Sequence, residues 1–325
     1  MRNVSKSRGV SRNAMYARKR RNKFKSPFLL ILFMLLCVIA WFVGAYAATG
    51  LRQEPPQFVD YFTQAAAPTQ KLPSATHATQ TDMQTLTFGQ LIELSNNHLL
   101  LVNNRHRVPY GLIGELAPVI DYVWTLNANI LMNRDALEML SKMFASAANA
   151  GHRAFRVTEG YRTHEQQRFL YDTAADSTFV ATPGYSEHQT GLAADISYHG
   201  VNIANSEEGA WLMRNSYRYG FVLRYPKHKT HITGLPFEPW HYRFVGLPHA
   251  YFMHRNDLVL EEYIDHLRRH GKISISLGGV DYTVFYLANP GESIEVPVDY
   301  SFMASLDNTG GIIVTAWSAA NGGAE

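Results

Sequence analysis

A stretch of 21 residues without a charge, Phe28 to Ala48, constrains this 325-residue chain more than any other feature. As a helix it would span roughly 31 Å, about the thickness of the hydrocarbon core of a bilayer. Trp41 and Tyr46 lie toward its far end, where amphipathic rings favour the headgroup level. We therefore predict a transmembrane helix and assign residues 27–48 to it, which makes the lipid bilayer one expected partner.

The charge distribution predicts how this segment is oriented across the membrane. The formal net charge of +3 combines 30 basic with 27 acidic residues, but residues 1–26 hold ten of the basic residues and no acid. Positive flanks stay in the cytoplasm, so we predict a single-pass protein with a cytoplasmic N-terminus and an extracytoplasmic body. That body carries 20 basic against 27 acidic residues, a net of −7. It has no excess of basic residues with which to bind phosphates, so we expect no nucleic-acid partner.

Two further points concern the same segment. Ala45-Tyr46-Ala47 has the small-x-small form of a signal-peptidase site, so cleavage after Ala47 stays open as an alternative to an anchor. The only cysteine, Cys37, also lies here. A single cysteine excludes a disulfide framework and a cysteine-built zinc finger.

The remainder of the chain divides by composition. Residues 49–85 are rich in Thr, Gln, Ala and Pro and are predicted to form a flexible linker. Residues 86–271 have a globular pattern. Gly278-Gly279, between two β-rich runs, is a hairpin signal, so residues 272–325 are predicted to be a small β-rich appendage.

The globular part mixes helical and strand signals without a regular βαβ order, which favours an α+β fold. Asn133 is a candidate helix cap, and Thr163 with Gln166 has the form of a capping box. The segments that we expect to be strands are 99–102, 155–158, 194–197 and 221–223.

One stretch offers ligands for a metal. Catalytic zinc takes three protein ligands and keeps a fourth position open for water. His188 stands in a predicted loop between Gly184 and Gly191, and Asp195 lies on the predicted strand that follows. A third ligand is available from His241. Glu238 precedes it by three residues, in a segment where Pro236 and Pro239 disfavour a helix, and is predicted to lie beside the metal-bound water.

These residues resemble both signatures of the D-alanyl-D-alanine metallopeptidases related to lysostaphin and hedgehog. The signatures here read Ser186-x-His188-x-x-Gly191-x-Ala193-x-Asp195 and Glu238-x-Trp240-His241. Gly160-Tyr161-Arg162-Thr163-x-x-x-Gln167 resembles the family's upstream substrate-binding motif, although the family usually has Ser where this chain has Thr163. Residues 98–325 are similar to VanY-type D,D-carboxypeptidases of glycopeptide-resistant bacteria.

The resemblance implies a zinc metallopeptidase domain with a central antiparallel sheet flanked by helices. It implies one Zn²⁺ per chain, held by His188, Asp195 and His241. Glu238 is then expected to move protons as the catalytic base, and Arg162 to stabilise the oxyanion. The residues expected to contact substrate are Ser186, Gln167 and Tyr185.

The predicted function is removal of the C-terminal D-Ala from peptidoglycan precursor stem peptides that end in D-Ala-D-Ala, an activity that contributes to vancomycin resistance. Two alternatives remain at this stage. The same zinc site suits an L,D-carboxypeptidase or a peptidoglycan endopeptidase. A non-catalytic wall-binding ectodomain is the other, but it would need no base such as Glu238 beside the metal.

Overall fold

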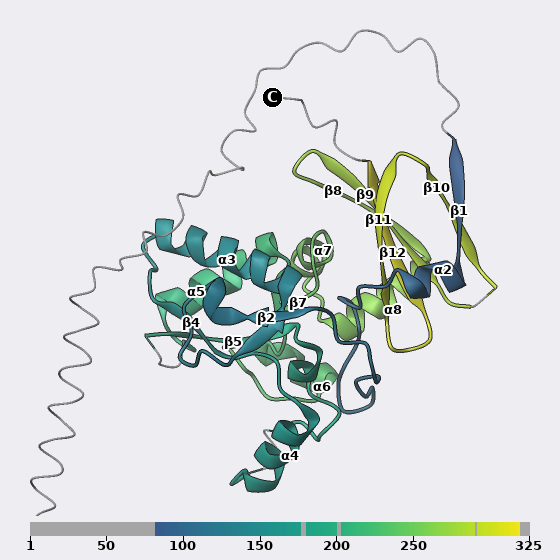
Figure 1. The fold of residues 1–325 in the computed structure, drawn as a ribbon. Coiled ribbons are helices and arrows are strands. Elements are labelled where there is room, and N and C mark those ends of the chain that lie inside the picture. The colour runs from purple at the N-terminus through teal and green to yellow at the C-terminus, as the bar shows by residue number, and fades with distance from the viewer. Residues whose placement is uncertain (1–81, 177–179, 200–202, 290, 319–325) are drawn as a thin grey trace, which may run out of the picture. The chain divides into compact units, whose positions relative to one another are not determined.

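Two four-stranded antiparallel sheets organise the part of the chain that the computed structural model describes (Figure 1). This part comprises residues 82–176, 180–199, 203–289 and 291–318, and it belongs to a unit that extends from Asp60 to Glu325. The predicted basic tail, the membrane anchor and linker residues 49–81 lie outside the described residues. Within the described ranges, no helix is both long and apolar enough to cross a membrane.

The helices and strands follow one another in mixed order. The strands are β1 (Met83–Thr87), β2 (Leu116–Pro118), β3 (Leu131–Asn133), β4 (Phe155–Glu159), β5 (Ala193–Tyr198), β6 (Phe221–Leu223), β7 (His241–Phe244), β8 (Lys272–Leu277), β9 (Val280–Leu287), β10 (Ser293–Pro297), β11 (Tyr300–Leu306) and β12 (Ile312–Ser318). The α-helices are α2 (Phe88–Glu93), α3 (Arg134–Asn149), α4 (His164–Thr173), α5 (Glu207–Asn215), α6 (Thr230–Thr233), α7 (His249–Arg255) and α8 (Leu260–His270). This mixture confirms the predicted combination of helices and sheets.

The first large sheet, here called the site sheet, has the strand order β4-β5-β7-β6. Helix α3 packs against it and begins where predicted, because the Asn133 side chain accepts a hydrogen bond from the Ala136 amide. Leu137 and Leu140 on α3 share one buried core with Val157 and Ile196 of the sheet. The strand register places Asp195 directly opposite His241.

Helix α4 differs from the others in what it buries. Thr163 and Gln166 form the predicted capping box at its start. Gln167 is its one buried residue, whereas Phe169 is 71% exposed. In Figure 1 this helix extends away from the sheets. Packing of an apolar face therefore contributes little to α4, and its buried residue, Gln167, bonds to Arg162 and to the Ala181 carbonyl.

The second large sheet, here called the appendage sheet, has the order β11-β12-β9-β8. The predicted hairpin is present as β8 and β9, joined by Gly278 and Gly279, both with positive φ. Strand β1 pairs with β10 over the full length of both strands. Leu91 of α2 is buried with residues of β10 and β12. The segment 83–93 thus packs with the appendage, although residues 83–85 are predicted to belong to the linker and residues from 86 onward to the peptidase domain.

The predicted strand at 99–102 is wrong. These residues are buried, as their apolar character indicates, but they pair with no strand. The Leu99 amide donates to the Ser305 hydroxyl, and the Leu101 amide donates to the Asp307 carbonyl. The Leu100 carbonyl accepts from the Arg243 guanidinium. The segment therefore connects the two large sheets through bonds that an apolar run does not reveal.

Candidate metal centre and active site

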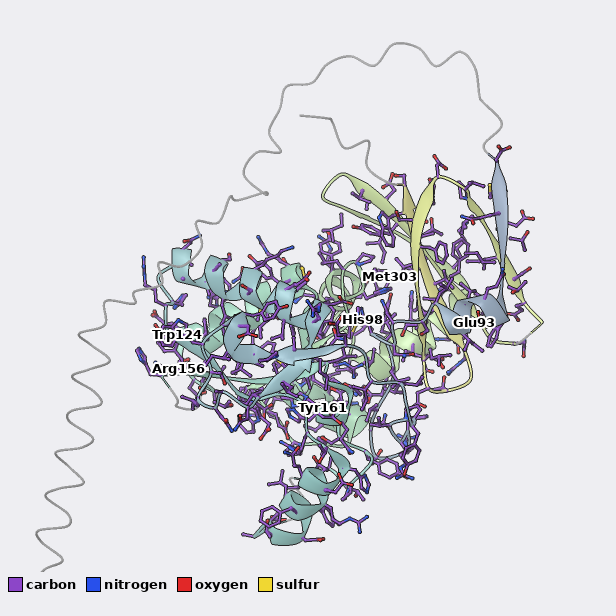
Figure 2. The ribbon with its side chains drawn as sticks, in the orientation of Figure 1. Glu93, His98, Trp124, Arg156, Tyr161 and Met303 are labelled. Carbon is purple, nitrogen blue, oxygen red and sulfur yellow. The ribbon has the colours of Figure 1, made fainter. Side chains whose placement is uncertain are left out.

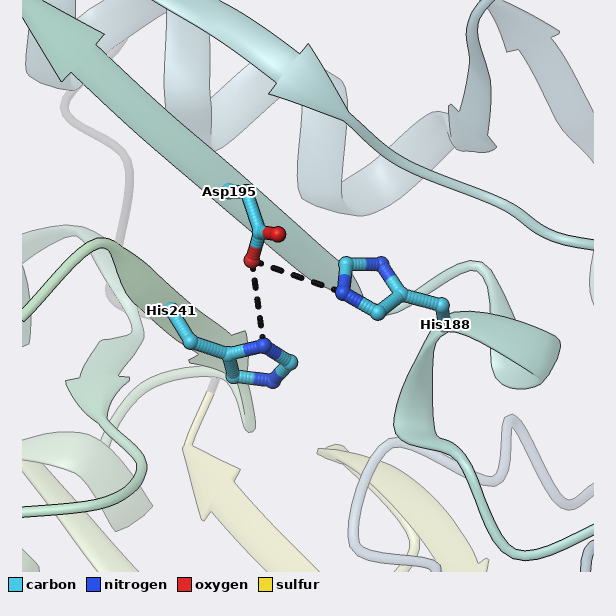
Figure 3. A group of neighbouring side chains, drawn as sticks. All are labelled: His188, Asp195 and His241. Atoms are coloured by element: carbon cyan, nitrogen blue, oxygen red, sulfur yellow. Dashed lines mark ion pairs between the residues drawn. The ribbon is translucent and has the colours of Figure 1, made fainter. Parts of the chain in front are cut away.

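Three predicted ligands come together at one end of the site sheet (Figure 3). His188 lies on a 3₁₀ turn (Glu187–Thr190), Asp195 on β5 and His241 on β7. One ligand atom from each lies within 4.8 Å of the others. Asp195 Oδ1 is 3.4 Å from His188 Nε2 and 3.1 Å from His241 Nδ1. The structure thus brings together all three residues that the motif places on a metal.

The remaining imidazole nitrogens have fixed partners. His188 Nδ1 donates to the Gly160 carbonyl at 2.7 Å, which leaves Nε2 to face Asp195. A Cβ on Gly160 would lie 2.5 Å from the Leu131 carbonyl oxygen, so only glycine permits this close approach. His241 Nε2 lies 3.4 Å from Glu187 Oε2 and donates to it, which leaves Nδ1 to face Asp195. Each ring is therefore held with one nitrogen available as a ligand.

The residues fit a divalent metal ion. Asp195 Oδ1 is buried and has no hydrogen-bond partner among the described residues, although two ring nitrogens lie near it. An orphaned buried carboxylate oxygen needs a cation or a donor. Two imidazoles and one carboxylate are a ligand set that zinc accepts. Burial alone would raise the pKa of Asp195, but His188 and His241 hold it well below its usual range, so the carboxylate is charged.

A fourth residue, Glu238, lies beside this group. Its Oε2 is 3.7 Å from His241 Nδ1. Its amide donates to the Tyr225 carbonyl, and its carbonyl accepts from the His241 amide. Burial, reinforced by the charge of Asp195, raises the pKa of Glu238 to about 7. A carboxylate with a pKa near neutrality is able both to accept and to return a proton.

The site opens into a cavity of about 170 Å³. Arg162 lines it and is held from both sides, because Nη1 donates to Gln167 Oε1 at 2.7 Å and Nη2 lies 3.3 Å from Glu159 Oε2. Gln167 Nε2 donates to the Ala181 carbonyl. The lining residues are Arg162, Gln167, Leu170, Val180, Ala181, Ser186, Glu187, His188, Asp195, Tyr225, Leu235, Glu238, Trp240 and His241. Tyr185, predicted to contact substrate, is not among them.

Sequence reasoning missed one residue that the structure places at the centre of the site. Glu187 is 1% exposed and contacts His241, Arg224 and Arg243. These opposite charges hold the pKa of Glu187 well below its usual range, although burial opposes this. The one sequence signal for Glu187 was its position immediately before His188. Its partners lie 37 to 56 residues away in sequence, so the contacts themselves could not be predicted.

The fold and the site together define a zinc-peptidase type of metal-dependent hydrolase, and comparisons with known proteins agree. A family model described as VanY, D-alanyl-D-alanine carboxypeptidase, matches residues 129–247. A D-alanyl-D-alanine carboxypeptidase of Enterococcus faecium is 32% identical over 302 residues, which cover 90% of this chain and 96% of that protein.

Two solved structures are also similar. The vancomycin resistance D,D-dipeptidase VanXYg, in complex with a D-Ala-D-Ala phosphinate analogue, is 29% identical with a TM-score of 0.64, and the match covers 73% of this chain and 99% of that chain. A mutant of the vancomycin resistance D,D-pentapeptidase VanY from the VanB-type cassette, in complex with Zn(II), is 37% identical with a TM-score of 0.45, covering 51% of this chain and 98% of that chain. The chain belongs to the VanY family of D-alanyl-D-alanine carboxypeptidases, which places it among zinc-dependent hydrolases.

Proposed function

We propose that the protein is a membrane-anchored, extracytoplasmic zinc D,D-carboxypeptidase that removes the terminal D-Ala from peptidoglycan precursor pentapeptides. The observation that carries this proposal is a largely buried carboxylate, Glu238, beside three residues that are able to hold a metal ion, in an open cavity. The complex of VanXYg with a D-Ala-D-Ala analogue supports the substrate class. Cleavage would leave a tetrapeptide stem that glycopeptides bind poorly, which supports a contribution to vancomycin resistance.

The proposed metal is one Zn²⁺ per chain, held by His188, Asp195 and His241. When bound there, zinc supplies Lewis-acid polarisation of a water molecule and of the scissile carbonyl. The chain itself supplies the fixed orientation of the three ligands, since Gly160 and Glu187 occupy the second nitrogens of the two rings.

The catalytic roles follow from the positions around the metal site. Glu238 accepts a proton from the attacking water and returns it to the leaving amine of D-Ala, which a pKa raised towards neutrality permits. Arg162, held by Gln167 and Glu159, donates to the oxygen that becomes negative at the scissile carbonyl. Ser186 lines the same cavity and is proposed to contact the substrate together with Gln167. Tyr185 does not line the cavity, but it stays a proposed substrate contact.

The location is proposed from the sequence. The charge-free segment Phe28–Ala48 is long enough to span a bilayer, and the ten basic residues before it favour a cytoplasmic N-terminus. The body beyond it would then meet stem peptides on membrane-bound precursors. Protease protection in sealed membrane vesicles tests the orientation.

Two experiments test the reaction. Mass analysis of a pentapeptide digest should show loss of one terminal alanine and no further trimming. Release of a second residue, or cleavage of a cross-link, would instead identify an L,D-carboxypeptidase or an endopeptidase that uses the same site.

The second experiment replaces Glu238 by Ala. We expect kcat to fall about 10²–10⁴-fold, because proton transfer is lost, while zinc remains bound. Glu115→Ala is a matched control, since Glu115 pairs with Arg134 at an exposed position. Full activity in Glu238→Ala would reject the proposed mechanism, and a wild-type protein that hydrolyses no stem peptide would favour the non-catalytic alternative.

A further inference from the structure

A buried cluster of charges lies directly behind the metal site. It contains two carboxylates, Glu187 and Glu261, and two guanidiniums, Arg224 and Arg243. The side chains of Glu187, Arg224 and Arg243 have no exposed surface. Buried ions are costly unless they are paired and fully hydrogen-bonded, so the arrangement of this cluster calls for an explanation.

The two oxygens of the Glu187 carboxylate have different tasks. Oε1 accepts from Arg224 Nε at 2.8 Å and from Arg243 Nη1 at 2.8 Å. Oε2 is then left for the imidazole of His241, whose Nε2 lies 3.4 Å away. Both arginines bind the oxygen that faces away from the imidazole, and so the carboxylate is fixed with its second oxygen aimed at one metal ligand.

The arginines are themselves held by distant segments. Arg224 makes a two-pronged pair with Glu261 on α8, at 2.9 and 2.7 Å. Arg243 donates through Nη2 to the carbonyls of His98 and Leu100. His98 is labelled in Figure 2. The next residue, Leu99, bonds to the appendage sheet through Ser305. The orientation of Glu187 therefore depends on α8 and on residues 98–100, not only on the turn that carries it.

We propose that Glu187 is a positioning residue for the metal site: it fixes the His241 ring with the proton on Nε2, so that Nδ1 is the ligand atom. This inference rests on the proposed zinc site and deepens it. A carboxylate partner holds a ligating imidazole in one tautomer and increases its basicity, and loss of such a partner typically weakens metal binding 10–100-fold. A purely structural ion cluster would stabilise the fold and leave metal affinity unchanged.

The test compares zinc affinity in full-length variants. Glu187→Gln keeps the shape of the side chain. Because the two arginines need an acceptor, the amide oxygen takes the place of Oε1 and the NH₂ group faces His241 Nε2. A donor at that place no longer favours a proton on Nε2. We expect the zinc dissociation constant, measured by competition with a chromophoric chelator, to rise about 10–100-fold. The visible spectrum of the Co²⁺-loaded protein should change as well, because the ligand geometry changes.

The matched control is Glu262→Gln. Glu262 lies beside Glu261 on α8 and pairs with Lys229 at 2.9 Å, without contact to the metal ligands. Its loss should lower thermal stability and leave zinc affinity at the wild-type value. A second variant, Glu187→Asp, keeps the charge for both arginines but shortens the reach toward His241, so it should fold and still bind zinc more weakly.

The outcomes separate the two proposals. A wild-type protein that binds no zinc would reject the proposed function. Wild-type zinc affinity in the folded Glu187 variants, with only their melting temperature lowered, would reject the positioning role and leave the proposed function standing. Weaker zinc binding in both Glu187 variants, but not in Glu262→Gln, supports the positioning role.

Discussion

The two four-stranded sheets share strand number and antiparallel pairing, yet they bury different chemistry. The site sheet carries Asp195, His241 and Arg243 on adjacent strands, and Asp195 Oδ1 has no hydrogen-bond partner among the described residues. On the appendage sheet, the buried hydroxyls of Ser305 and Thr315 have partners. The difference indicates that the site sheet is arranged for a ligand and the appendage sheet for stability.

Two buried histidines show the same contrast. His241 faces carboxylates: although burial disfavours its charge, the nearby carboxylates of Asp195 and Glu187 raise its pKa to about 9. His249 on α7 lies between the hydroxyls of Tyr263 and Thr315. Burial lowers its pKa to about 3, and the nearby His98 contributes. The neighbours, rather than burial itself, therefore decide whether a buried imidazole favours a cation.

The largest expected effect comes from removing Asp195. Asp195→Ala leaves the two imidazoles without the carboxylate that completes the ligand set. We expect zinc content, measured by elemental analysis, to fall to background, and hydrolysis of a pentapeptide to fall to that of chelator-treated wild type. Retention of stoichiometric zinc in the variant would show that the site sheet holds its metal elsewhere.

The next effect concerns Arg162, which lines the cavity without belonging to the metal ligands. Arg162→Ala removes the donor that we propose stabilises the oxygen that gains charge, so kcat/KM should fall about 10²–10³-fold while zinc stays bound. Steady-state kinetics on a pentapeptide measures this. Arg268→Ala is the control away from the metal site, since Arg268 lies on α8 and contacts Asp265, Tyr286 and Thr309. An unchanged kcat with only KM raised would reassign Arg162 to substrate binding.

Local signals in the sequence account for much of this structure. Asn133 and Thr163 cap the helices that they were predicted to cap, and Gly278-Gly279 forms the predicted hairpin. The three candidate metal ligands, which the structure brings together, could be predicted because two of them, His188 and Asp195, lie within one short motif. Fixed spacing of ligand-type residues is readable in a sequence, since the chemistry needs those side chains.

Long-range pairing was not readable. Leu99–Val102 is apolar and buried, but its hydrogen-bond partners are distant residues such as Ser305, so a predicted strand was wrong. The pairing of β1 with β10 joins segments that lie far apart in the sequence and carry no matching pattern. Glu187 was missed for the same reason, because its ion-pair partners, Arg224 and Arg243, are distant in sequence.

The third prediction concerns pH and His249. Its folded-state pKa is about 3, against 6.5 for the ordinary side chain. The unfolded chain therefore binds a proton that the folded chain excludes, so stability is fully present above pH 6.5 and is lost as pH falls toward 3, by up to about 1.4 kcal/mol per pH unit. Urea unfolding between pH 7 and pH 4 should show a shallower decline in His249→Gln than in wild type. Equal slopes would contradict the shifted pKa.

The smallest effect is expected at the hydroxyl that serves His249. Thr315 is 1% exposed and its Oγ1 lies 3.0 Å from His249 Nε2. Thr315→Val keeps the shape and β-branching of the side chain but leaves a buried ring nitrogen unpaired, which costs about 1–3 kcal/mol in the free energy of unfolding. Because Thr315 belongs to the appendage sheet, zinc affinity and kcat should equal the wild-type values. Denaturant unfolding measures the first quantity and pentapeptide kinetics the second. A loss of zinc affinity would show that the two sheets are coupled more tightly than their separate chemistry indicates, and that the ion cluster around Arg243 transmits changes in the appendage to His241.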